Sequence, residues 1–228
     1  MAQLISGLQA QRVADNVARV RERIAVAREH APARAPGGGR AEVELLAAVK
    51  YVAVDDLPPL ADAGVRLVGE NRAQELAAKH AAHGALFEWD FIGQLQSRRV
   101  REIVPYARLI HSVASESVLR ALERCREQAR PDLRILIEVN VAGEQGKAGV
   151  APQHVGEFVA KAPVPVAGLM TMPPLAATAE DNRHWFAALR ALADEHGLQH
   201  LSMGTSQDYV VAVQEGATIV RIGTSLYS

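Results

Sequence analysis

The chain repeats one pattern eight times: a short apolar run, followed in most cases by a helical pattern. The apolar runs cover residues 43–50, 66–70, 89–92, 109–113, 135–141, 166–170, 200–203 and 218–222. The helical patterns between them cover residues 55–63, 72–83, 96–104, 116–128, 152–161, 180–196 and 206–215. Strands that alternate with helices in this way form right-handed βαβ units around a parallel sheet.

Eight such units in 228 residues predict an α/β protein whose residues 1–228 form a single closed (β/α)8 TIM barrel. An open, doubly wound sheet is the alternative. It would normally have fewer strands and a glycine-rich first turn, and the sequence contains no GxGxxG or GxxxxGK[ST] segment. An extra helix is expected over residues 1–30, where apolar positions recur with helical spacing from residue 3. The Pro- and Gly-rich residues 31–41 read as a flexible linker, with a mobile lid as the second interpretation.

Composition excludes several classes of protein. The net charge of −1 gives no basic excess of the kind that nucleic-acid binders carry. The single cysteine, Cys125, excludes an internal disulfide framework and a CxxC metal or redox site. No apolar run reaches the roughly 18 residues that a membrane span needs, and no signal-peptide core is present. We therefore expect a cytoplasmic protein that contacts neither nucleic acid nor a membrane.

Polar residues follow the apolar runs at their C-terminal ends, which form one rim of a barrel. Strand alternation places Leu46, Ala48 and Lys50 on one face, taken as the interior, and points Tyr51 away from Lys50. Burial at the mouth would favour the neutral amine of Lys50, a nucleophile that forms a Schiff base with an aldehyde or ketone. The alternative is an ion pair between Lys50 and Glu70 that closes the rim.

Small and hydroxyl-bearing residues follow the last two runs, where such barrels usually bind phosphate. Ser202, Gly204 and Ser206 lead into a helix expected to begin near Ser206, and Gly223 and Thr224 repeat the pattern after the eighth run. Ordinary helix capping by Ser206 is the alternative. An inward lysine beside a phosphate-type rim suits a phosphorylated aldehyde, which could be pyridoxal 5′-phosphate (PLP) or a sugar phosphate.

At these residues the sequence resembles the pyridoxal phosphate homeostasis proteins, the YggS/PROSC family of PLP-binding proteins. The main matching segments are LLAAVK ending at Lys50, VGENRAQE at 68–75, DFIGQLQS at 90–97, LSMGTS at 201–206 and VRIGTSLY at 220–227. Weaker matches are IHSVAS at 110–115, ILIEVNV at 135–141 and GLMTMPP at 168–174. The resemblance implies a barrel like the N-terminal domain of alanine racemase, the PLP fold type III.

The resemblance also implies roles for individual residues. Lys50 would form the Schiff base with PLP, and Asn71 would lie beside the cofactor. Arg221, which shares an inward face with Ile219 and Gly223, would face the pyridine ring. An arginine at the ring nitrogen keeps that nitrogen unprotonated, which weakens PLP as an electron sink.

The resemblance places the phosphate between two loops. Ser202, Gly204 and Ser206 would approach it from one side, and Gly223 and Thr224 from the other. The family usually has histidine where this chain has Asp90, and methionine and aspartate where it has Thr205 and Gln207.

The expected function is to hold PLP and supply it to apo-enzymes within the cell, with PLP homeostasis as the outcome. The related racemases use a second domain to supply a catalytic group on the opposite face of the cofactor, and no such domain is expected after the eighth run. We therefore expect a monomeric, non-catalytic binder without a metal site that contacts apo-enzymes transiently. A weakly active PLP-dependent racemase is the alternative, and a Schiff-base aldolase is a third hypothesis. Lys147, in the Gly-rich loop after the fifth run, reads as a surface charge or as a second PLP contact.

Overall fold

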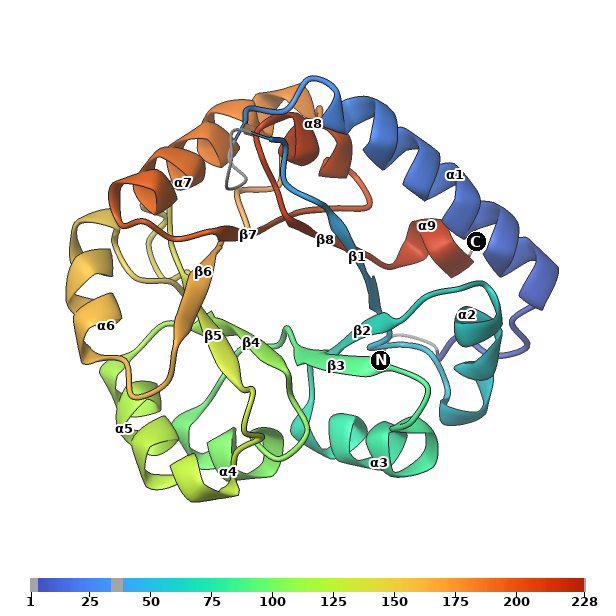
Figure 1. Ribbon diagram of the computed structural model, residues 1–228, viewed down its shortest axis with the longest axis horizontal. Helices are drawn as coiled ribbons and strands as arrows, with labels where there is room; N and C mark the ends of the chain where they lie inside the picture. The colour runs from blue at the N-terminus through green and yellow to red at the C-terminus, as the bar shows by residue number, and fades with distance from the viewer. Residues whose placement is uncertain (1–3, 34–38, 228) are drawn as a thin grey trace.

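Eight parallel strands pair in chain order and close into a barrel in the computed structural model, which describes residues 4–33 and 39–227 (Figure 1). The strands are β1 (Glu44–Ala48), β2 (Leu67–Glu70), β3 (Glu88–Phe91), β4 (Leu109–Val113), β5 (Arg134–Glu138), β6 (Val166–Met170), β7 (His200–Thr205) and β8 (Ile219–Ile222). Each predicted run contributes one strand, so the predicted (β/α)8 barrel is confirmed. Closure depends on β1 and β8, which pair from Glu44 opposite Ile219 to Ala47 opposite Ile222.

Helices surround the strands on the outside of the barrel (Figure 1). They are α1 (Ala10–Arg28), α2 (Pro58–Asp62), α3 (Ala73–His83), α4 (Val100–Ile103), α5 (Glu116–Arg124), α6 (Val155–Lys161), α7 (Arg183–Glu195), α8 (Tyr209–Gln214) and α9 (Thr224–Tyr227). Several predicted helices are shorter than expected because part of each is a 3-10 turn, as over Pro152–His154 before α6. The short helix α9 was not predicted. Ser115 caps α5, since its hydroxyl accepts the amide hydrogen of Val118 at 3.4 Å.

The N-terminal helix is shorter than the predicted residues 1–30. The segment before α1 is extended instead, because Ile5 pairs with the chain that follows β1: its amide donates to the Tyr51 carbonyl at 2.6 Å, and its carbonyl accepts from Ala53 at 3.0 Å. Helix α1 then runs along α8 and α9 (Figure 1), and the Asn16 amide donates to the Leu226 carbonyl at 3.2 Å. The first helix therefore covers the outside of the closure between β1 and β8.

Residues 34–38 of the predicted flexible linker lie outside the described residues. Its described ends are held to α1. The guanidinium of Arg28 donates to the carbonyls of Ala41 and Arg40, at 2.9 and 3.1 Å, and Arg40 donates to the Ala31 carbonyl at 3.0 Å.

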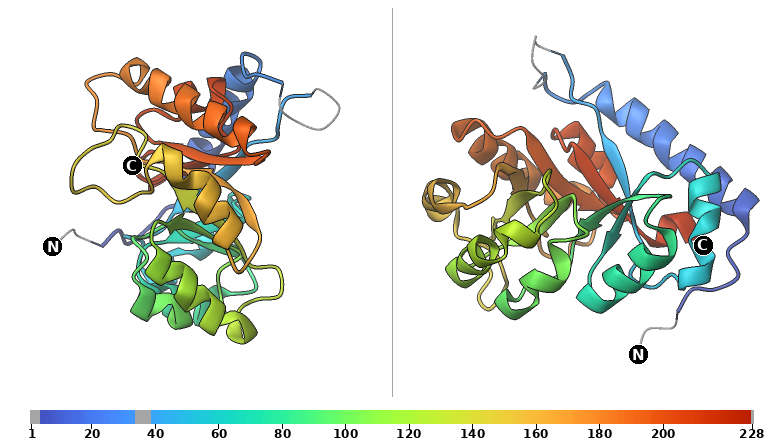
Figure 2. Two further views of the ribbon diagram at one scale, coloured as in Figure 1. Left: turned by 90° about the vertical axis from the view of Figure 1, so that its left-hand side faces the viewer. Right: turned by 60° about the horizontal axis from the view of Figure 1, so that its bottom comes forward.

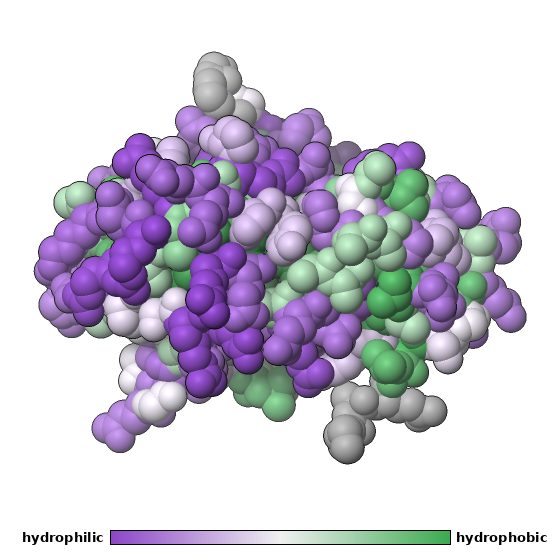
Figure 3. All heavy atoms as spheres, turned by 90° about the horizontal axis from the view of Figure 1, so that it is seen from below, coloured by the Kyte–Doolittle hydropathy of each residue, from purple (hydrophilic) through white to green (hydrophobic). Residues whose placement is uncertain are grey.

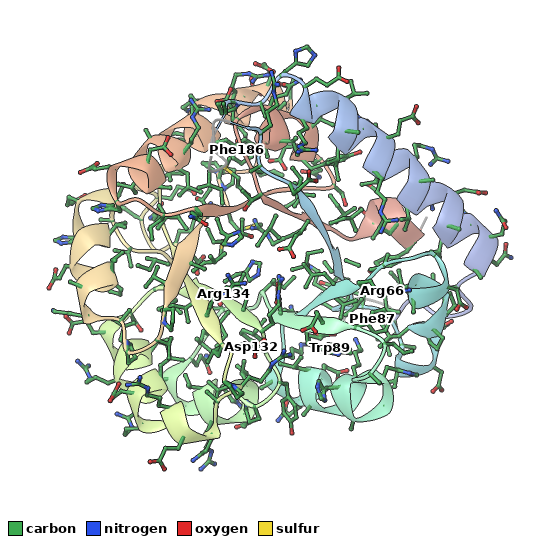
Figure 4. All side chains as sticks on the ribbon, viewed as in Figure 1. Arg66, Phe87, Trp89, Asp132, Arg134 and Phe186 are labelled. Atoms are coloured by element: carbon green, nitrogen blue, oxygen red, sulfur yellow. The ribbon has the colours of Figure 1, made fainter. Side chains whose placement is uncertain are left out.

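Strand alternation divides the apolar side chains into two groups. A small cluster fills the barrel interior and consists of Leu46, Leu67, Leu109, Leu136, Met170 and Ile219. A much larger cluster lies between the strands and the helices, where Phe186 of α7 packs against the sheet (Figure 4).

Figure 2 shows that the loop after β5 projects from the same side of the barrel as the N-terminal segment, which marks the rim at the C-terminal ends of the strands.

The outer surface is mixed in character. Figure 3 shows the side of the barrel that carries α3 and α4, which is largely hydrophilic with a paler, partly apolar strip. Within the described ranges, no helix is both long and apolar enough to cross a bilayer.

Replacing Phe186 with alanine is expected to lower the free energy of unfolding by about 3–5 kcal/mol, because a fully buried ring is lost and a cavity remains. Chemical denaturation followed by circular dichroism measures the change. The neighbouring, exposed His184 provides the control: His184→Ala should leave the midpoint almost unchanged. Equal effects of the two changes would contradict the packing described here.

Candidate functional site

A cavity of about 520 Å³ opens at the C-terminal ends of the strands. Its walls come from both ends of the chain, since residues after β1, β2 and β3 face residues after β6, β7 and β8. Six of the eight predicted site residues line it: Lys50, Asn71, Ser206, Arg221, Gly223 and Thr224. Ser202 and Gly204 lie behind this wall. The size lies within the usual range for small-molecule sites, about 300–1,000 Å³.

Lys50 reaches the mouth of the cavity, but its environment differs from the prediction. The residue is exposed, so the expected burial is wrong. The Tyr51 ring does not point away either, because its centroid lies 5.0 Å from the Lys50 amine. Strand β1 ends at Ala48 and a turn follows, so alternation no longer applies to these two side chains.

The predicted alternative, an ion pair between Lys50 and Glu70, is wrong because Glu70 is paired elsewhere. Its carboxylate accepts a hydrogen bond from the ammonium of Lys79, and both side chains are almost fully buried. The same ammonium donates to the Val49 carbonyl at 2.7 Å, and Glu70 also accepts from the Asn71 amide at 2.8 Å. This buried pair therefore fixes the chain directly before Lys50 and directly at Asn71.

Lysine is a rare residue in this chain, which makes its placement informative. The four lysines are Lys50, Lys79, Lys147 and Lys161. Lys79 is buried against Glu70, Lys147 pairs with Glu144, and Lys161 pairs with Glu116 and Glu157. Lys50 alone among the four lines the cavity.

The two small-residue loops meet at the cavity wall. The Ser206 hydroxyl accepts the amide hydrogen of Gly223 at 3.2 Å, which joins the loop after β7 to the end of β8. The following helix begins at Tyr209 rather than near Ser206, so the alternative in which Ser206 caps that helix is wrong. Asp208 holds the loop instead, since its carboxylate accepts from the Thr205 amide at 2.7 Å.

Gly204 has a packing reason to be glycine. Its φ is +90°, and a Cβ built there would lie 2.6 Å from the Cβ of Ala212 in α8. A side chain at this position would therefore push α8 away from β7. Gly93 is similar at the opposite wall, where a Cβ would lie 2.1 Å from the Asn71 carbonyl oxygen.

Arg221 points inward as predicted and is almost fully buried. One terminal nitrogen donates to the carbonyl and hydroxyl of Ser202, at 2.8 and 2.6 Å. The other donates to the Thr171 carbonyl at 2.9 Å and to the Met172 sulfur at 2.8 Å. Burial lowers the pKa of Arg221 to about 10, so the guanidinium still carries its charge at neutral pH.

A group of buried charges that the sequence pattern does not predict lies behind Arg221. Asp90 and His111 are fully buried inside the barrel and lie 3.1 Å apart. Arg108 donates to both oxygens of Asp90, at 3.0 and 2.9 Å, and also to Glu44. The sequence does contain one sign of these charges: Asp90 stands where the family usually has histidine, and a carboxylate on a buried strand needs partners.

Protonation inside the barrel follows from burial and these contacts. Burial opposes ionisation of Asp90, but the hydrogen bonds from His111 and Arg108 outweigh it and keep the pKa of this carboxyl below its ordinary value. Burial lowers the pKa of His111 despite the opposing effect of Asp90, and the charges of Arg221 and Arg108 add to the lowering. The imidazole is therefore neutral at pH 7.

The side chains at the cavity suit a phosphorylated aromatic aldehyde such as PLP. Lys50 can react with an aldehyde, Arg221 presents a cation to a ring, and Ser206 and Thr224 offer hydroxyls to a phosphate. Both cavity volume and donor set therefore fit the cofactor that the resemblance implies.

Comparison with known proteins identifies the family. The family described as "Alanine racemase, N-terminal domain" matches residues 9–228. The pyridoxal phosphate homeostasis protein of Aquifex aeolicus is 40% identical over 224 residues, covering 93% of this chain and 96% of that protein. The chain belongs to the pyridoxal phosphate homeostasis protein family. The Pseudomonas aeruginosa member is 37% identical, with 94% of each chain covered.

Solved structures agree with this family and with the fold. PipY of Synechococcus elongatus, in the structure with PLP bound, has a TM-score of 0.78 at 30% identity and covers 95% of this chain and 100% of that chain. The alanine racemase of Corynebacterium glutamicum has a TM-score of 0.63 at 21% identity, covering 99% of this chain and 63% of that chain, which is a likeness of fold. The predicted alanine racemase-like barrel is therefore confirmed, and PLP is the cofactor of the family.

Replacing Lys79 with methionine is expected to lower the free energy of unfolding by about 3–5 kcal/mol, because the Glu70 carboxylate would be left buried without its counter-ion. A second change, Glu70→Gln, should restore much of this loss. Urea denaturation of both variants measures the effect. Lys161→Met removes an exposed lysine and serves as the control, with little change expected. A loss from Lys79→Met no larger than the control would contradict a structural role for the buried pair.

Stability should fall as the pH drops below about 6.5, the ordinary pKa of histidine in an unfolded chain. The pKa of His111 is lower in the folded state, so the unfolded state binds the proton first as the pH falls. The free energy of unfolding therefore decreases by up to about 1.4 kcal/mol per pH unit until the folded-state pKa is reached. His111→Gln should flatten this dependence, leaving a smaller part from His80 and His200, whose pKa values burial also lowers. Denaturation midpoints between pH 5 and 8 test this, and an unchanged slope in the variant would rule it out.

Proposed function

We propose that this protein binds PLP through a Schiff base to Lys50 and supplies it to apo-enzymes. The observation that carries the proposal is the meeting of Lys50, Arg221 and the two hydroxyl-bearing loops at one cavity. The PLP-bound structure of PipY and the family's name support the choice of ligand over a sugar phosphate. When bound, the cofactor supplies an aldehyde that condenses with the lysine amine and releases one water.

Different residues contact different parts of the proposed ligand. Lys50 holds the aldehyde carbon. Asn71, whose backbone amide donates a hydrogen bond to the Glu70 carboxylate, lies beside the ring. Arg221 faces the ring nitrogen and keeps it unprotonated. On the phosphate side, Ser206, Gly223 and Thr224 supply donors directly.

Ser202 and Gly204 contribute to the same site from behind the cavity wall. Gly204 keeps α8 close to β7, which sets the path of the loop that carries Ser206. Ser202 holds the guanidinium of Arg221.

Holding and release suit this site better than turnover. Lys50 and Tyr51 are exposed, so the covalent bond to the ligand stays accessible to water and to competing amines. Loss of PLP is the reverse of its capture and needs no further catalytic group. We therefore infer that the protein meets apo-enzymes transiently at this rim, and we propose that it does so as a monomer in the cytoplasm.

A weakly active racemase is the second candidate function, and the position of Tyr51 favours testing it. The Tyr51 ring lies beside the Lys50 amine, where a phenol could exchange a proton. A racemase needs a second acid or base on the opposite face of the ligand.

Visible spectroscopy with added PLP tests the main proposal. The wild type should gain an absorption band that borohydride reduction fixes covalently to Lys50, as located by peptide mass spectrometry. Lys50→Ala should lose the band, whereas Lys161→Ala, which removes a distant surface lysine, should keep it. Absence of the band from the wild type would end the PLP proposal and make phosphorylated sugars the next ligands to screen.

Racemisation assays with single amino acids decide between the two functions. The wild type loaded with PLP should invert alanine at no more than the rate of free PLP, and Tyr51→Phe should not change that rate. Robust turnover that Tyr51→Phe abolishes would establish the racemase instead.

A further inference from the structure

A row of hydrogen bonds crosses the barrel interior and ends at Arg221. Asp90 on β3 lies 3.1 Å from Nε2 of His111 on β4. Nδ1 of His111 lies 2.8 Å from the hydroxyl of Ser202 on β7. That hydroxyl accepts from Arg221 on β8 at 2.6 Å. We call these four side chains the core relay.

The direction of each hydrogen bond in the core relay follows from the chemistry of its members. The ionised Asp90 only accepts, so Nε2 of the neutral His111 carries the hydrogen and Nδ1 is the acceptor. The Ser202 hydroxyl must then donate to Nδ1, which leaves its oxygen to accept from Arg221. Donation therefore runs in one direction, from Arg221 through Ser202 and His111 to Asp90.

Burying the core relay costs free energy, because the surrounding side chains of the barrel interior are aliphatic. A buried carboxylate is tolerated only with counter-ions and hydrogen bonds, and Arg108 supplies both from the opposite end of the barrel. A barrel interior of this size could be filled by aliphatic residues alone. The polar row reaches the cavity at one residue, Arg221.

We propose that Asp90, His111 and Ser202 are positioning residues, which hold the guanidinium of Arg221 toward the ring nitrogen of the bound ligand. The inference rests on the proposed function, in which Arg221 faces that nitrogen. Ser202 fixes one terminal nitrogen of Arg221, and the Thr171 carbonyl fixes the other. The relay thereby sets the plane of the guanidinium and connects it to the negative charge of Asp90.

This role for Ser202 differs in a measurable way from a phosphate contact. A positioning residue that acts through Arg221 affects any ligand with a ring nitrogen, whether or not the ligand has a phosphate. A phosphate contact affects PLP and leaves pyridoxal, which lacks the phosphate, unchanged. A PLP analogue with carbon in place of the ring nitrogen provides the third probe.

Binding of the three probes to Ser202→Ala tests the proposal. Loss of one hydrogen bond to a charged group should weaken PLP about tenfold. Pyridoxal should weaken by the same factor, and the carbon analogue should bind as it does to the wild type. The visible absorption maximum of bound PLP should also shift, which loss of stability alone would not cause. Ser202→Thr keeps the hydroxyl and should restore affinity and spectrum.

Two outcomes would overturn the core relay as a positioning device. Weakening of PLP without weakening of pyridoxal would make Ser202 a phosphate contact, and unchanged affinity for all probes would leave the relay without influence on the site. Thr218→Val is the matched control, since it removes another buried hydroxyl, which lies directly before β8 at the end away from the cavity and accepts the amide hydrogen of Leu201. A wild type that binds no PLP would overturn the proposed function together with the inference.

The ligand-free protein offers an independent readout. Nitrogen-15 chemical shifts should report the Nε2–H tautomer of His111 near neutral pH. Asp90→Asn, which removes the charge and keeps the size, should lose this tautomer preference and weaken PLP by a similar factor. An Nδ1–H tautomer in the wild type would reverse the direction of donation and overturn the proposal, even if PLP binds.

Discussion

The pairing of β1 with β8 is the constraint on which the site depends. Closure brings the end of β1 beside the end of β8, so that Lys50 and Arg221 line one cavity although most of the chain separates them. In an open sheet these two strands would lie at opposite edges or would pair with other strands. Helix α1 packs over this same closure, and the side-chain amide of Asn16 on α1 donates a hydrogen bond to the Leu226 carbonyl in α9. The extra N-terminal helix therefore stabilises the junction from which the site is built.

Two clusters of buried charge in this barrel each pair a carboxylate with a cation. Glu70 meets Lys79 between the strands and α3, and Asp90 meets Arg108 and His111 inside the barrel. The two clusters serve different walls of the cavity. The first fixes the segments that carry Lys50 and Asn71, and the second leads to Arg221. Both clusters keep side chains in place by hydrogen bonds with defined geometry, which aliphatic packing alone would not provide.

Most of the fold could be predicted because the strand pattern depends on local periodicity. The eight runs and the inward direction of Arg221 required only alternation within a strand. The surroundings of Lys50 could not be predicted, because β1 ends at Ala48 and a turn decides where Lys50 and Tyr51 point. The partner of Glu70 was missed for a related reason. Lys79 comes from the middle of a helical pattern, and its burial depends on how α3 packs against β1 and β2. The core relay links residues on four strands, so no spacing in the sequence reveals it.

The contrast between Lys50 and Lys79 has a consequence for chemical selectivity. Both are primary amines and both lie near the end of β1, yet Lys50 is exposed at the mouth whereas Lys79 is 1% exposed and bound to a carboxylate. A reagent that modifies amines from solution meets the first and is excluded from the second. Of these two amines, reactive aldehydes in the surrounding medium would therefore meet only that of Lys50. Between Lys50 and Lys79, the fold thus assigns this chemistry to Lys50 through access, before any difference in intrinsic nucleophilicity comes into play.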